Sequence, residues 1–213
     1  LDLDNFLRKN PGMSLGPSRS DSLVLIGLFQ FKEIAKGGRI IEDLYELEIT
    51  ILPKQQLKLP KVVEIGGRIP RNGKHHVNPD YSLCLGSPVR LLSILSSQPS
   101  LAGFAEKCIV PFLYAMSCVL KFGDPFVFGE LAHGEKGIID DYCELFSVKT
   151  QAQVIRVLEV LGSKRRQANK EPCLCGCGKR LGVCKFNRII NRYRKLAPRS
   201  WFKKHAMNPG QGV

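Results

Sequence analysis

Long hydrophobic runs are missing from this chain of 213 residues. No apolar stretch reaches the ~18 residues that a membrane-spanning helix requires, so we expect no contact with a membrane. Internal repeats are missing as well. Hydrophobic residues make up 44% and charged residues 24% of the sequence, a balance typical of a soluble globular protein with a buried core.

Acidic residues are scarce in the last third of the chain. Residues 149–213 carry 16 lysines and arginines against two acids, Glu159 and Glu171, whereas residues 1–148 carry 16 basic and 17 acidic side chains. This sharp change in charge predicts one domain over 1–148 and a basic module over 149–213. A basic module favours acidic partners such as nucleic acid or an acidic protein face, and a solvated helix surface is the alternative.

The cysteine pattern of a secreted disulfide framework is also missing. Of the eight cysteines, four are scattered through the first domain and four are clustered in the second. The scattered ones are Cys84, Cys108, Cys118 and Cys143, and the clustered ones are Cys173, Cys175, Cys177 and Cys184. Dispersed thiols beside a dense cluster indicate reduced cysteines and a bound metal. We therefore expect a cytoplasmic protein.

Strand patterns come first along the chain and helical patterns follow. A short amphipathic helix is expected at residues 1–7 and a loop over 11–20. Strands are expected over 22–31, 39–52 and 61–69, with a turn at 35–38. Helices are expected over 89–95, 101–120, 138–146 and 148–161, the second of them interrupted at Pro111. Sequential strands with short links predict an antiparallel meander, and strands followed by helices predict an α+β fold.

A candidate thiol site lies in the segment 74–86. His76 and Asn78 precede a turn, and a single Cys84 follows between Leu83 and Leu85. The two leucines would anchor the backbone while the thiol points outward. A reactive thiol needs solvent access and a route to the thiolate. The alternative is a buried strand cysteine with no chemical role.

This segment resembles the ubiquitin-conjugating (UBC) enzyme family, in particular the bacterial branch found in antiphage (CBASS-type) operons. The matching residues are Pro60 to Pro70, then His76-Val77-Asn78, then Leu83-Cys84-Leu85. The order of strands, turn, cysteine and helices is similar over residues 22–146. The resemblance implies a UBC-like antiparallel four-strand meander with flanking helices.

By this resemblance, Cys84 is the nucleophile that accepts a C-terminal glycine acyl group as a thioester and passes it to a target nucleophile. Asn78 matches the residue that orders the active-site loop and stabilises the oxyanion of aminolysis. His76 matches the histidine that holds the turn. Three features depart from the family pattern. Val77 replaces a proline, Asn78 lies two residues closer to Cys84 than is usual in eukaryotic members, and Tyr81 stands where glycine is common.

Other polar residues near these segments have weaker candidate roles. His75 and His133 are candidates for proton transfer, with a surface or packing role as the alternative. Asp140 and Asp141 are interpreted as acids at a helix N-terminus, where they favour the dipole, and the alternative is that they orient an incoming amine.

The cysteine cluster has the spacing of a zinc site. Cys173, Cys175 and Cys177 alternate along the chain, and Cys184 follows seven residues later. Four thiolates suit tetrahedral Zn²⁺, and an all-protein ligand set leaves no open position for catalysis, so a structural metal is expected. Redox chemistry of the thiols is the alternative. A zinc hydrolase is disfavoured because no His and Glu ligand set with an open position is visible.

The same cluster resembles the SEC-C zinc motif. The matching residues are Cys173, Cys175, Gly176, Gly178, Lys179 and Cys184. Lys185 stands where the motif has its fourth ligand, so Cys177 is the expected substitute and His205 the remote alternative. The basic residues that follow interleave with aromatic ones, which is compatible with contact to nucleic acid or to an acidic protein.

The operon branch implies a partner. That partner is a cGAS-like nucleotidyltransferase, a cyclic-oligonucleotide synthase, acting as donor or target together with an activating enzyme. The alternative function is a non-catalytic module whose basic zinc tail binds nucleic acid or an acidic protein. Cys84 argues against this alternative, because inactive members of the family typically lose the cysteine.

Overall fold

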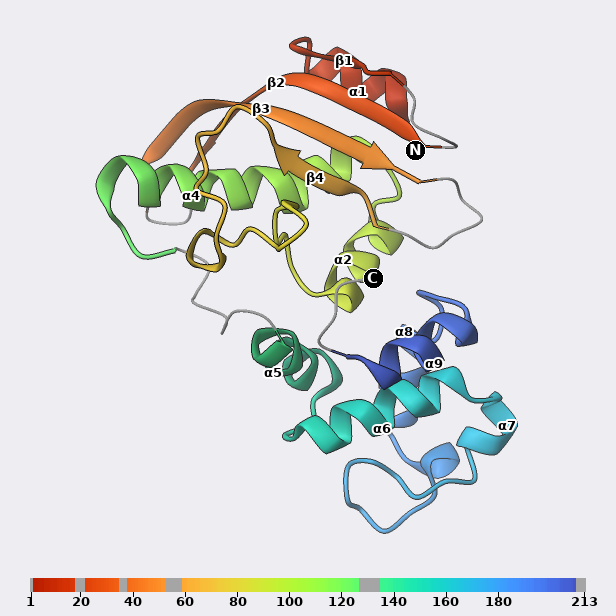
Figure 1. Cartoon of the computed structure of the whole chain (residues 1–213). Coiled ribbons are helices and arrows are strands. Elements are labelled where there is room, and N and C mark those ends of the chain that lie inside the picture. Colours follow the sequence, from red (N-terminus) through yellow and green to blue (C-terminus); the bar gives the residue numbers. More distant parts are fainter. Residues whose placement is uncertain (1, 18–21, 35–37, 53–58, 127–134, 210–213) are drawn as a thin grey trace. The chain divides into compact units, whose positions relative to one another are not determined.

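Residues 2–17, 22–34, 38–52, 59–126 and 135–209 are described by a computed structural model of the chain (Figure 1). They divide into two compact units. The first unit comprises Leu1–Gly86 and Ile94–Glu130, and the second comprises Ser87–Ser93 and Leu131–Val213. Most of the turn expected at 35–38, and the candidate His133, lie outside the described residues.

The first unit is built on a four-stranded antiparallel sheet in the order β1-β2-β3-β4. Its strands are β1 (Met13–Leu15), β2 (Leu23–Ile34), β3 (Ile40–Ile51) and β4 (Lys61–Glu64). β2 and β3 pair along their full length, from Leu23 opposite Ile51 to Ile34 opposite Ile40. The predicted antiparallel meander and the α+β class are therefore confirmed, but the strand expected over 61–69 ends at Glu64.

Strand β1 lies in a segment that was expected to be a loop. It follows α1 (Leu3–Lys9), the expected N-terminal helix, and pairs with β2 through Met13 and Gly27. A Cβ added at Gly27 would lie 2.2 Å from the Gly12 carbonyl oxygen. The two backbones therefore approach so closely that this position of β2 requires glycine.

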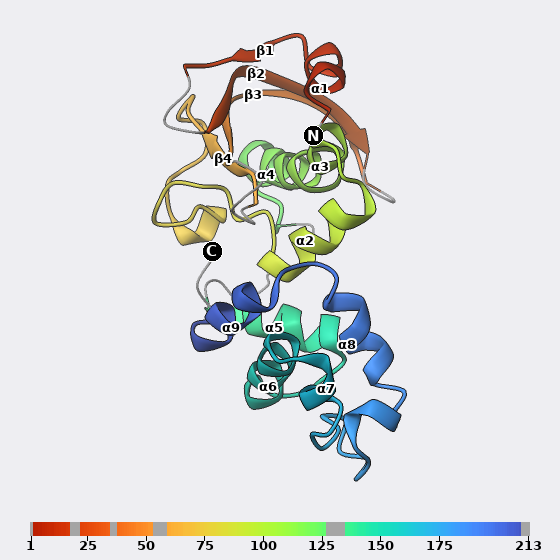
Figure 2. The same ribbon diagram turned by 90° about the vertical axis from the view of Figure 1, so that its right-hand side faces the viewer.

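A long apolar helical stretch packs beneath the sheet (Figure 1, Figure 2). It consists of α3 (Leu101–Phe104), the π-helical turn η2 (Ala105–Ile109) and α4 (Val110–Phe122). The interruption expected at Pro111 takes the form of this π turn, in which the Val110 N–H donates to the Ala105 carbonyl. Proline has no N–H and its ring clashes with the carbonyl four residues earlier, so a regular α-helical turn is disfavoured there.

The same stretch has the length and composition of a membrane-spanning helix. Within the described residues, Leu101–Phe122 is the one such candidate, with 22 residues and a mean hydropathy of 1.4. The core helix of a folded protein passes the same test, and 67% of the hydrophobic window is buried. We interpret the stretch as the core helix of the first unit.

The second unit is helical. Its elements are the first turns of α2 (Pro88–Ser97), then α5 (Glu135–Phe146), α6 (Gln151–Gly162), α7 (Arg165–Ala168), the 3-10 turn η3 (Leu181–Val183), α8 (Asn187–Tyr193) and α9 (Arg199–Met207). Thr150 caps α6 by accepting the Gln153 N–H at 3.2 Å. Along α6, Val154, Leu158 and Leu161 are buried, as the apolar stripe in the sequence predicts.

The border between the units differs from the domain boundary expected between residues 148 and 149. Helix α5 precedes that position, yet its Tyr142 and Phe146 belong to the same buried cluster as Phe202 of α9. Ser87–Ser93 also belongs to the second unit, through the buried Val89. The change in charge marks the start of a basic surface, whereas apolar packing defines the units.

Asp140 and Asp141 lie in the interior of α5, so their interpretation as acids at a helix N-terminus is wrong. The helix already includes Glu135, more than one turn earlier. Asp141 is 1% exposed and accepts hydrogen bonds from Ser87 Oγ and from Arg90 Nε, the latter at 2.8 Å. Its charge is therefore paired inside the second unit.

Candidate functional site

Cys84 lies in a return segment that extends the sheet beside β4. The Leu83 N–H donates to the Val62 carbonyl at 2.8 Å, and the segment forms an antiparallel bridge to β4. The Cys84 N–H donates to the His76 carbonyl at 2.8 Å. Hydrogen bonds to a strand and to the preceding turn therefore fix the backbone that carries the thiol.

The Cys84 side chain is half-buried, between a buried Leu83 and a half-buried Leu85. Burial raises the pKa of the Cys84 thiol above its ordinary value, and a hydrogen bond from the Gly86 backbone offsets this only in part. Within the described residues, no histidine or lysine side chain lowers the pKa of this thiol. At neutral pH the group is therefore a thiol.

His76 closes the short turn η1 (Gly73–His75) that precedes Cys84. Its backbone is left-handed, with φ of 52°, and its N–H donates to the Gly73 carbonyl at 3.0 Å. Its ring centroid lies 4.2 Å from that of Phe126, with 30° between the ring planes. His76 thus holds Cys84 through its carbonyl, while its ring packs against an aromatic neighbour.

Asn78 organises the turn between His76 and Cys84. Its N–H donates to the Ser82 carbonyl at 2.8 Å, and its side-chain Nδ2 donates to Ser82 Oγ at 3.0 Å. Its carbonyl accepts the Tyr81 N–H at 2.9 Å. Tyr81 has φ of 65°, a left-handed conformation that favours glycine.

Asp80 ties this turn to β4, although it belongs to none of the motifs recognised in the sequence. Its carboxylate accepts the Ser82 N–H at 3.1 Å and the Ser82 hydroxyl at 2.6 Å, and it pairs with Lys61 Nζ at 2.8 Å. Burial raises the pKa of Asp80, but the hydrogen bonds from Lys61 and Ser82 outweigh it and lower the pKa to about 2. The turn that precedes Cys84 is therefore held by a fixed negative charge.

Two other candidate histidines, His75 and His205, have structural partners. His75 Nδ1 lies 2.8 Å from Asn72 Oδ1 within the loop. His205, the alternative zinc ligand, is buried in the second unit, where its Nε2 lies 2.6 Å from Tyr142 Oη and its ring stacks on Trp201 at 4.6 Å. Burial lowers the pKa of His205 to about 4. His205 is therefore a neutral core residue that is separate from the cysteine cluster.

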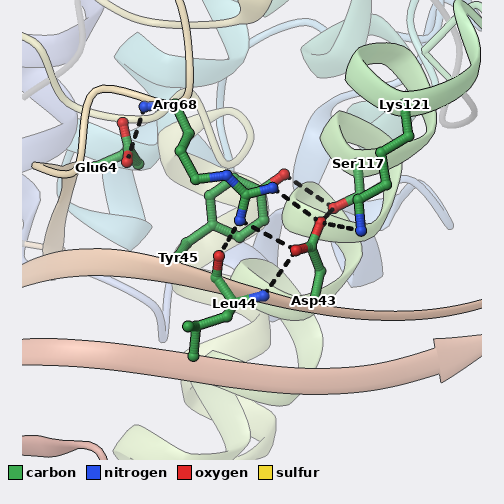
Figure 3. Close-up of polar contacts among 7 residues, drawn as sticks. All are labelled: Asp43, Leu44, Tyr45, Glu64, Arg68, Ser117 and Lys121. Atoms are coloured by element: carbon green, nitrogen blue, oxygen red, sulfur yellow. Dashed lines mark hydrogen bonds and ion pairs between the residues drawn. The ribbon is translucent and has the colours of Figure 1, made fainter.

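A polar cluster anchors the segment that leaves β4 toward the Cys84 loop (Figure 3). Asp43 of β3 accepts hydrogen bonds from Arg68 Nη1 at 3.0 Å and Ser117 Oγ at 2.7 Å, and it pairs with Lys121 Nζ at 2.9 Å. The Arg68 guanidinium lies over the Tyr45 ring, 4.2 Å from its centroid. Burial raises the pKa of Asp43, but hydrogen bonds from Arg68, Lys121 and Ser117 outweigh it and hold the pKa well below its ordinary value.

Asp43→Asn is expected to lower the free energy of unfolding by about 2–3 kcal/mol at pH 7, because it leaves Arg68 and Lys121 without their counter-ion. The pKa of Asp43 is lower in the folded protein than in the unfolded chain. Its contribution is therefore full above about pH 5 and is lost progressively as the pH falls below that value. Urea unfolding should show the difference between wild type and variant narrowing from about pH 5 to pH 3.

Glu42→Gln, at the adjacent exposed position, is the control. Glu42 pairs with Lys32 at 3.2 Å, and both side chains are more than half exposed. Such pairs contribute little, so the free energy of unfolding should change by less than about 0.5 kcal/mol. An equally small change for Asp43→Asn at pH 7 would contradict the anchoring role of the cluster.

Four cysteine thiols come together in the second unit. The Sγ atoms of Cys173, Cys175, Cys177 and Cys184 all lie within 4.8 Å of one another. The separation is 3.2 Å between Cys173 and Cys175 and 3.6 Å between Cys177 and Cys184. Tetrahedral zinc with Zn–S bonds of about 2.3 Å holds its sulfur ligands roughly 3.8 Å apart. The four thiols therefore form a group that fits a metal such as zinc.

Tight backbone turns bring these thiols together. Gly176 and Gly178, which alternate with the cysteines, have φ of 77° and 72°, in the region that favours glycine. The Cys173 N–H donates to the Lys179 carbonyl at 2.8 Å and closes the loop. Cys177 lies within the group, as its expected role as the substitute fourth ligand requires.

Comparison of the chain with protein families, with curated proteins and with solved structures gave no match. The roles of Cys84 and of the cysteine cluster must therefore be judged from their own geometry and chemistry.

Proposed function

We propose that the chain is a ubiquitin-conjugating-like enzyme that forms a thioester on Cys84 and transfers a protein C-terminal glycine acyl group to a target nucleophile. One observation carries the proposal. It is the half-buried Cys84 thiol, whose backbone is held by hydrogen bonds that involve Leu83 and His76. The thiol follows the antiparallel meander and a turn, and α2 comes next in the chain. This order of elements supports a UBC-like fold for the first unit, which is part of the proposal.

Transthiolation requires little from the enzyme beyond a positioned thiol. The Cys84 thiol loses its proton to water, its sulfur attacks the thioester carbonyl of the donor, and the donor thiolate leaves and is protonated by the solvent as the new thioester forms. A target amine then attacks the same carbonyl, and Cys84 leaves as a thiolate that regains a proton. Because the donor thioester is already activated, no hydrogen-bonded general base is needed at Cys84.

The raised pKa of Cys84 suits a carrier of acyl groups. A less acidic thiol is a poorer leaving group, so its thioester resists hydrolysis better than a thioester on an ordinary cysteine. The same property reduces the thiolate fraction at neutral pH and slows loading. Cys84 would therefore load slowly and keep its acyl group until a suitable nucleophile arrives.

In this proposal Asn78 and His76 shape the loop that presents the thiol. The His76 carbonyl holds the Cys84 N–H, and Asn78 closes the turn through Ser82. The Asn78 amide carries two hydrogens. One of them is engaged with Ser82, and we assign the other as a donor to the oxyanion of the tetrahedral intermediate.

The proposed setting is bacterial antiphage signalling in the cytoplasm. Its support is the resemblance of the Cys84 segment to the UBC branch of antiphage operons. The proposed partner is a cGAS-like nucleotidyltransferase, as acyl donor or as conjugated target, together with an activating enzyme. The proposed cofactor is structural Zn²⁺ on the four clustered cysteines, which would stabilise the second unit without joining the reaction, since four protein ligands leave no open position.

A peptide thioester that ends in glycine is the probe for this function. Incubated with the whole chain, it should acylate Cys84 selectively, and excess thiol should reverse the reaction. Intact mass and peptide mapping identify the modified residue. Acylation of Cys143 or of the clustered cysteines, with Cys84 unmodified, would refute the proposal and favour a non-catalytic module.

A further inference from the structure

Most of the positive charge in the second unit has no acidic partner. Among the described residues from 149 onward, Arg156 is the one basic side chain in a salt bridge, and it contacts Glu159 at 3.0 Å and Glu171 at 3.5 Å. These two glutamates are the only acids of residues 149–213. The other basic side chains are exposed, apart from the half-buried Arg194. Their charge is therefore available to a ligand.

Arg194 lies at the C-terminal end of α6. Its guanidinium donates hydrogen bonds to the carbonyls of Val160, Leu161 and Ser163, at 3.1, 3.4 and 2.8 Å. Its Nε is buried and has no hydrogen-bond partner among the described residues. The side chain is therefore fixed in place by the end of the helix, and its charge is not neutralised by a carboxylate.

Two more arginines lie at this end of α6. Arg165 begins α7 shortly after α6 ends, and Arg199 begins α9, which packs along α6. At that contact, a Cβ added at Gly162 would lie 3.1 Å from the Lys203 backbone nitrogen. Burial, and then the charges of Arg165 and Arg199, lower the pKa of Arg194. We call Arg165, Arg194 and Arg199 the arginine cluster.

The arginine cluster carries an electrostatic cost for the fold. Its like charges repel, and Arg199 stands in the first turn of α9, where the helix dipole disfavours cations. The two nearest acids in sequence, Glu159 and Glu171, are paired with Arg156. A bound anion would relieve both unfavourable terms, so Arg165 and Arg199 are better explained as part of a binding site than as stabilising residues.

The aromatic residues of this segment do not provide stacking surfaces. Phe186, Tyr193 and Phe202 are buried in the core of the second unit. Trp201 is half-buried, and its ring is stacked on His205. The interleaving of basic and aromatic residues in the sequence therefore reflects core packing, and contact with a ligand depends on charge.

Large apolar side chains are also scarce on this surface. In the described part of the second unit, Val183 and Met207 are the only exposed ones. Protein partners bind mainly through buried aromatic or aliphatic anchors, whereas a nucleic-acid backbone is held by Lys and Arg. The planar guanidinium of arginine also matches the geometry of a phosphate group. The surface therefore fits a phosphodiester backbone better than an acidic protein.

We propose that the arginine cluster and the basic side chains around it bind the phosphate backbone of a nucleic-acid duplex without reading its sequence. A duplex presents one negative charge per ~1.7 Å of its axis, which suits a surface with many unpaired cations. Single strands are usually held by aromatic stacking, for which this surface has no platform. The site is on the second unit and does not depend on the chemistry proposed for Cys84.

Fluorescence anisotropy with labelled DNA and RNA duplexes of about 20 base pairs tests this site in the whole, metal-loaded chain. We expect a Kd on the order of 10⁻⁶ M at low salt and a linear fall of log K with log salt. The double variant Arg165→Gln/Arg199→Gln should weaken binding at least about tenfold and reduce the magnitude of the salt slope by about 2, at ~0.9 per phosphate contact. Arg194 is not substituted in this variant, because its guanidinium donates hydrogen bonds to the carbonyls at the C-terminal end of α6.

Arg8→Gln/Lys107→Gln is the matched control, since it removes two exposed positive charges from the first unit. It should change the affinity by less than about twofold. Thermal melting confirms that both double variants are folded. Three results would overturn the proposal: no duplex binding at low salt, equal losses in the two variants, or a polyglutamate peptide that binds as tightly as a duplex, which would identify an acidic protein as the partner.

Discussion

Cys84→Ala is expected to abolish the thiol-sensitive acyl adduct, and Cys84→Ser to leave an adduct that excess thiol does not remove. Alanine has no nucleophile, whereas serine forms an oxyester. Both replacements are close in volume to cysteine and the site is half-buried, so the free energy of unfolding should change by less than about 1 kcal/mol. Intact mass before and after treatment with thiol gives the comparison.

Cys143→Ala is the matched control for this series. Cys143 is also partly exposed, and burial also raises the pKa of its thiol, but it lies on α5 in the second unit. The control should be acylated to the same extent as the wild type. An adduct that persists in Cys84→Ala, or that disappears in Cys143→Ala, would show that Cys84 is not the carrier.

The loading rate should rise with pH. Burial places the pKa of Cys84 above that of an ordinary cysteine, so only a small fraction of it is thiolate at pH 7. Because the thiolate is the attacking species, the initial rate should increase by roughly tenfold per pH unit from pH 7 toward the pKa. A rate that is already constant below about pH 8 would contradict a thiol whose pKa is raised by burial.

Removing the metal is expected to unfold the cysteine loop and to lower the melting temperature of the second unit by more than about 10 °C. Structural zinc contributes on the order of 10 kcal/mol to small domains. Here the loop joins the core of the unit through Cys173 and Leu181, so its loss should reach the helices. Elemental analysis should find about one zinc per chain, and calorimetry before and after chelation measures the shift.

Cys175→Ser separates loss of the metal from other effects of chelation. The Cys175 side chain is exposed, so this substitution removes a ligand without disturbing packing. It should lower the melting temperature about as much as chelation does. Cys143→Ser, in the same unit but outside the cluster, should keep both the metal and the melting temperature. A chain that has lost its metal and still melts at the original temperature would rule out the structural role.

The alternation and spacing of residues close together in the sequence predicted the elements whose formation depends mainly on those residues. Tyr45 and Leu47 alternate with acids, and this placed β3 and its buried face. Asp43 lies on the same face of β3 as these buried residues. An acidic residue on that face was the feature of the sequence that could have indicated the polar cluster in Figure 3. Its partners Arg68 and Lys121 come from distant segments, and no local pattern connects them. Strand β1 was missed because three residues show too little alternation to differ from a loop.

The two candidate sites differ in how far the sequence could describe them. The clustered cysteines lie close together in the chain, so their spacing was enough to predict that they meet. The surroundings of Cys84 depend on the carbonyls of Val62 and His76 and on the turn held by Asp80, which follow from strand pairing and loop closure. The arginine cluster forms only when α9 packs along α6. The excess of basic residues in the sequence therefore indicated a basic second unit, but it could not show which arginines come together.

The chain passes between its two units three times, because Ser87–Ser93 belongs to the second unit while the residues on either side belong to the first. A fragment beginning at residue 131 would lack Val89 from its core and Arg90, the counter-ion of the buried Asp141. An uncompensated buried charge of this kind costs about 3–5 kcal/mol. A gene fusion or a proteolytic cut at one point would therefore separate the unit from part of its own interior, and this fold cannot gain or lose that unit as a simple terminal cassette.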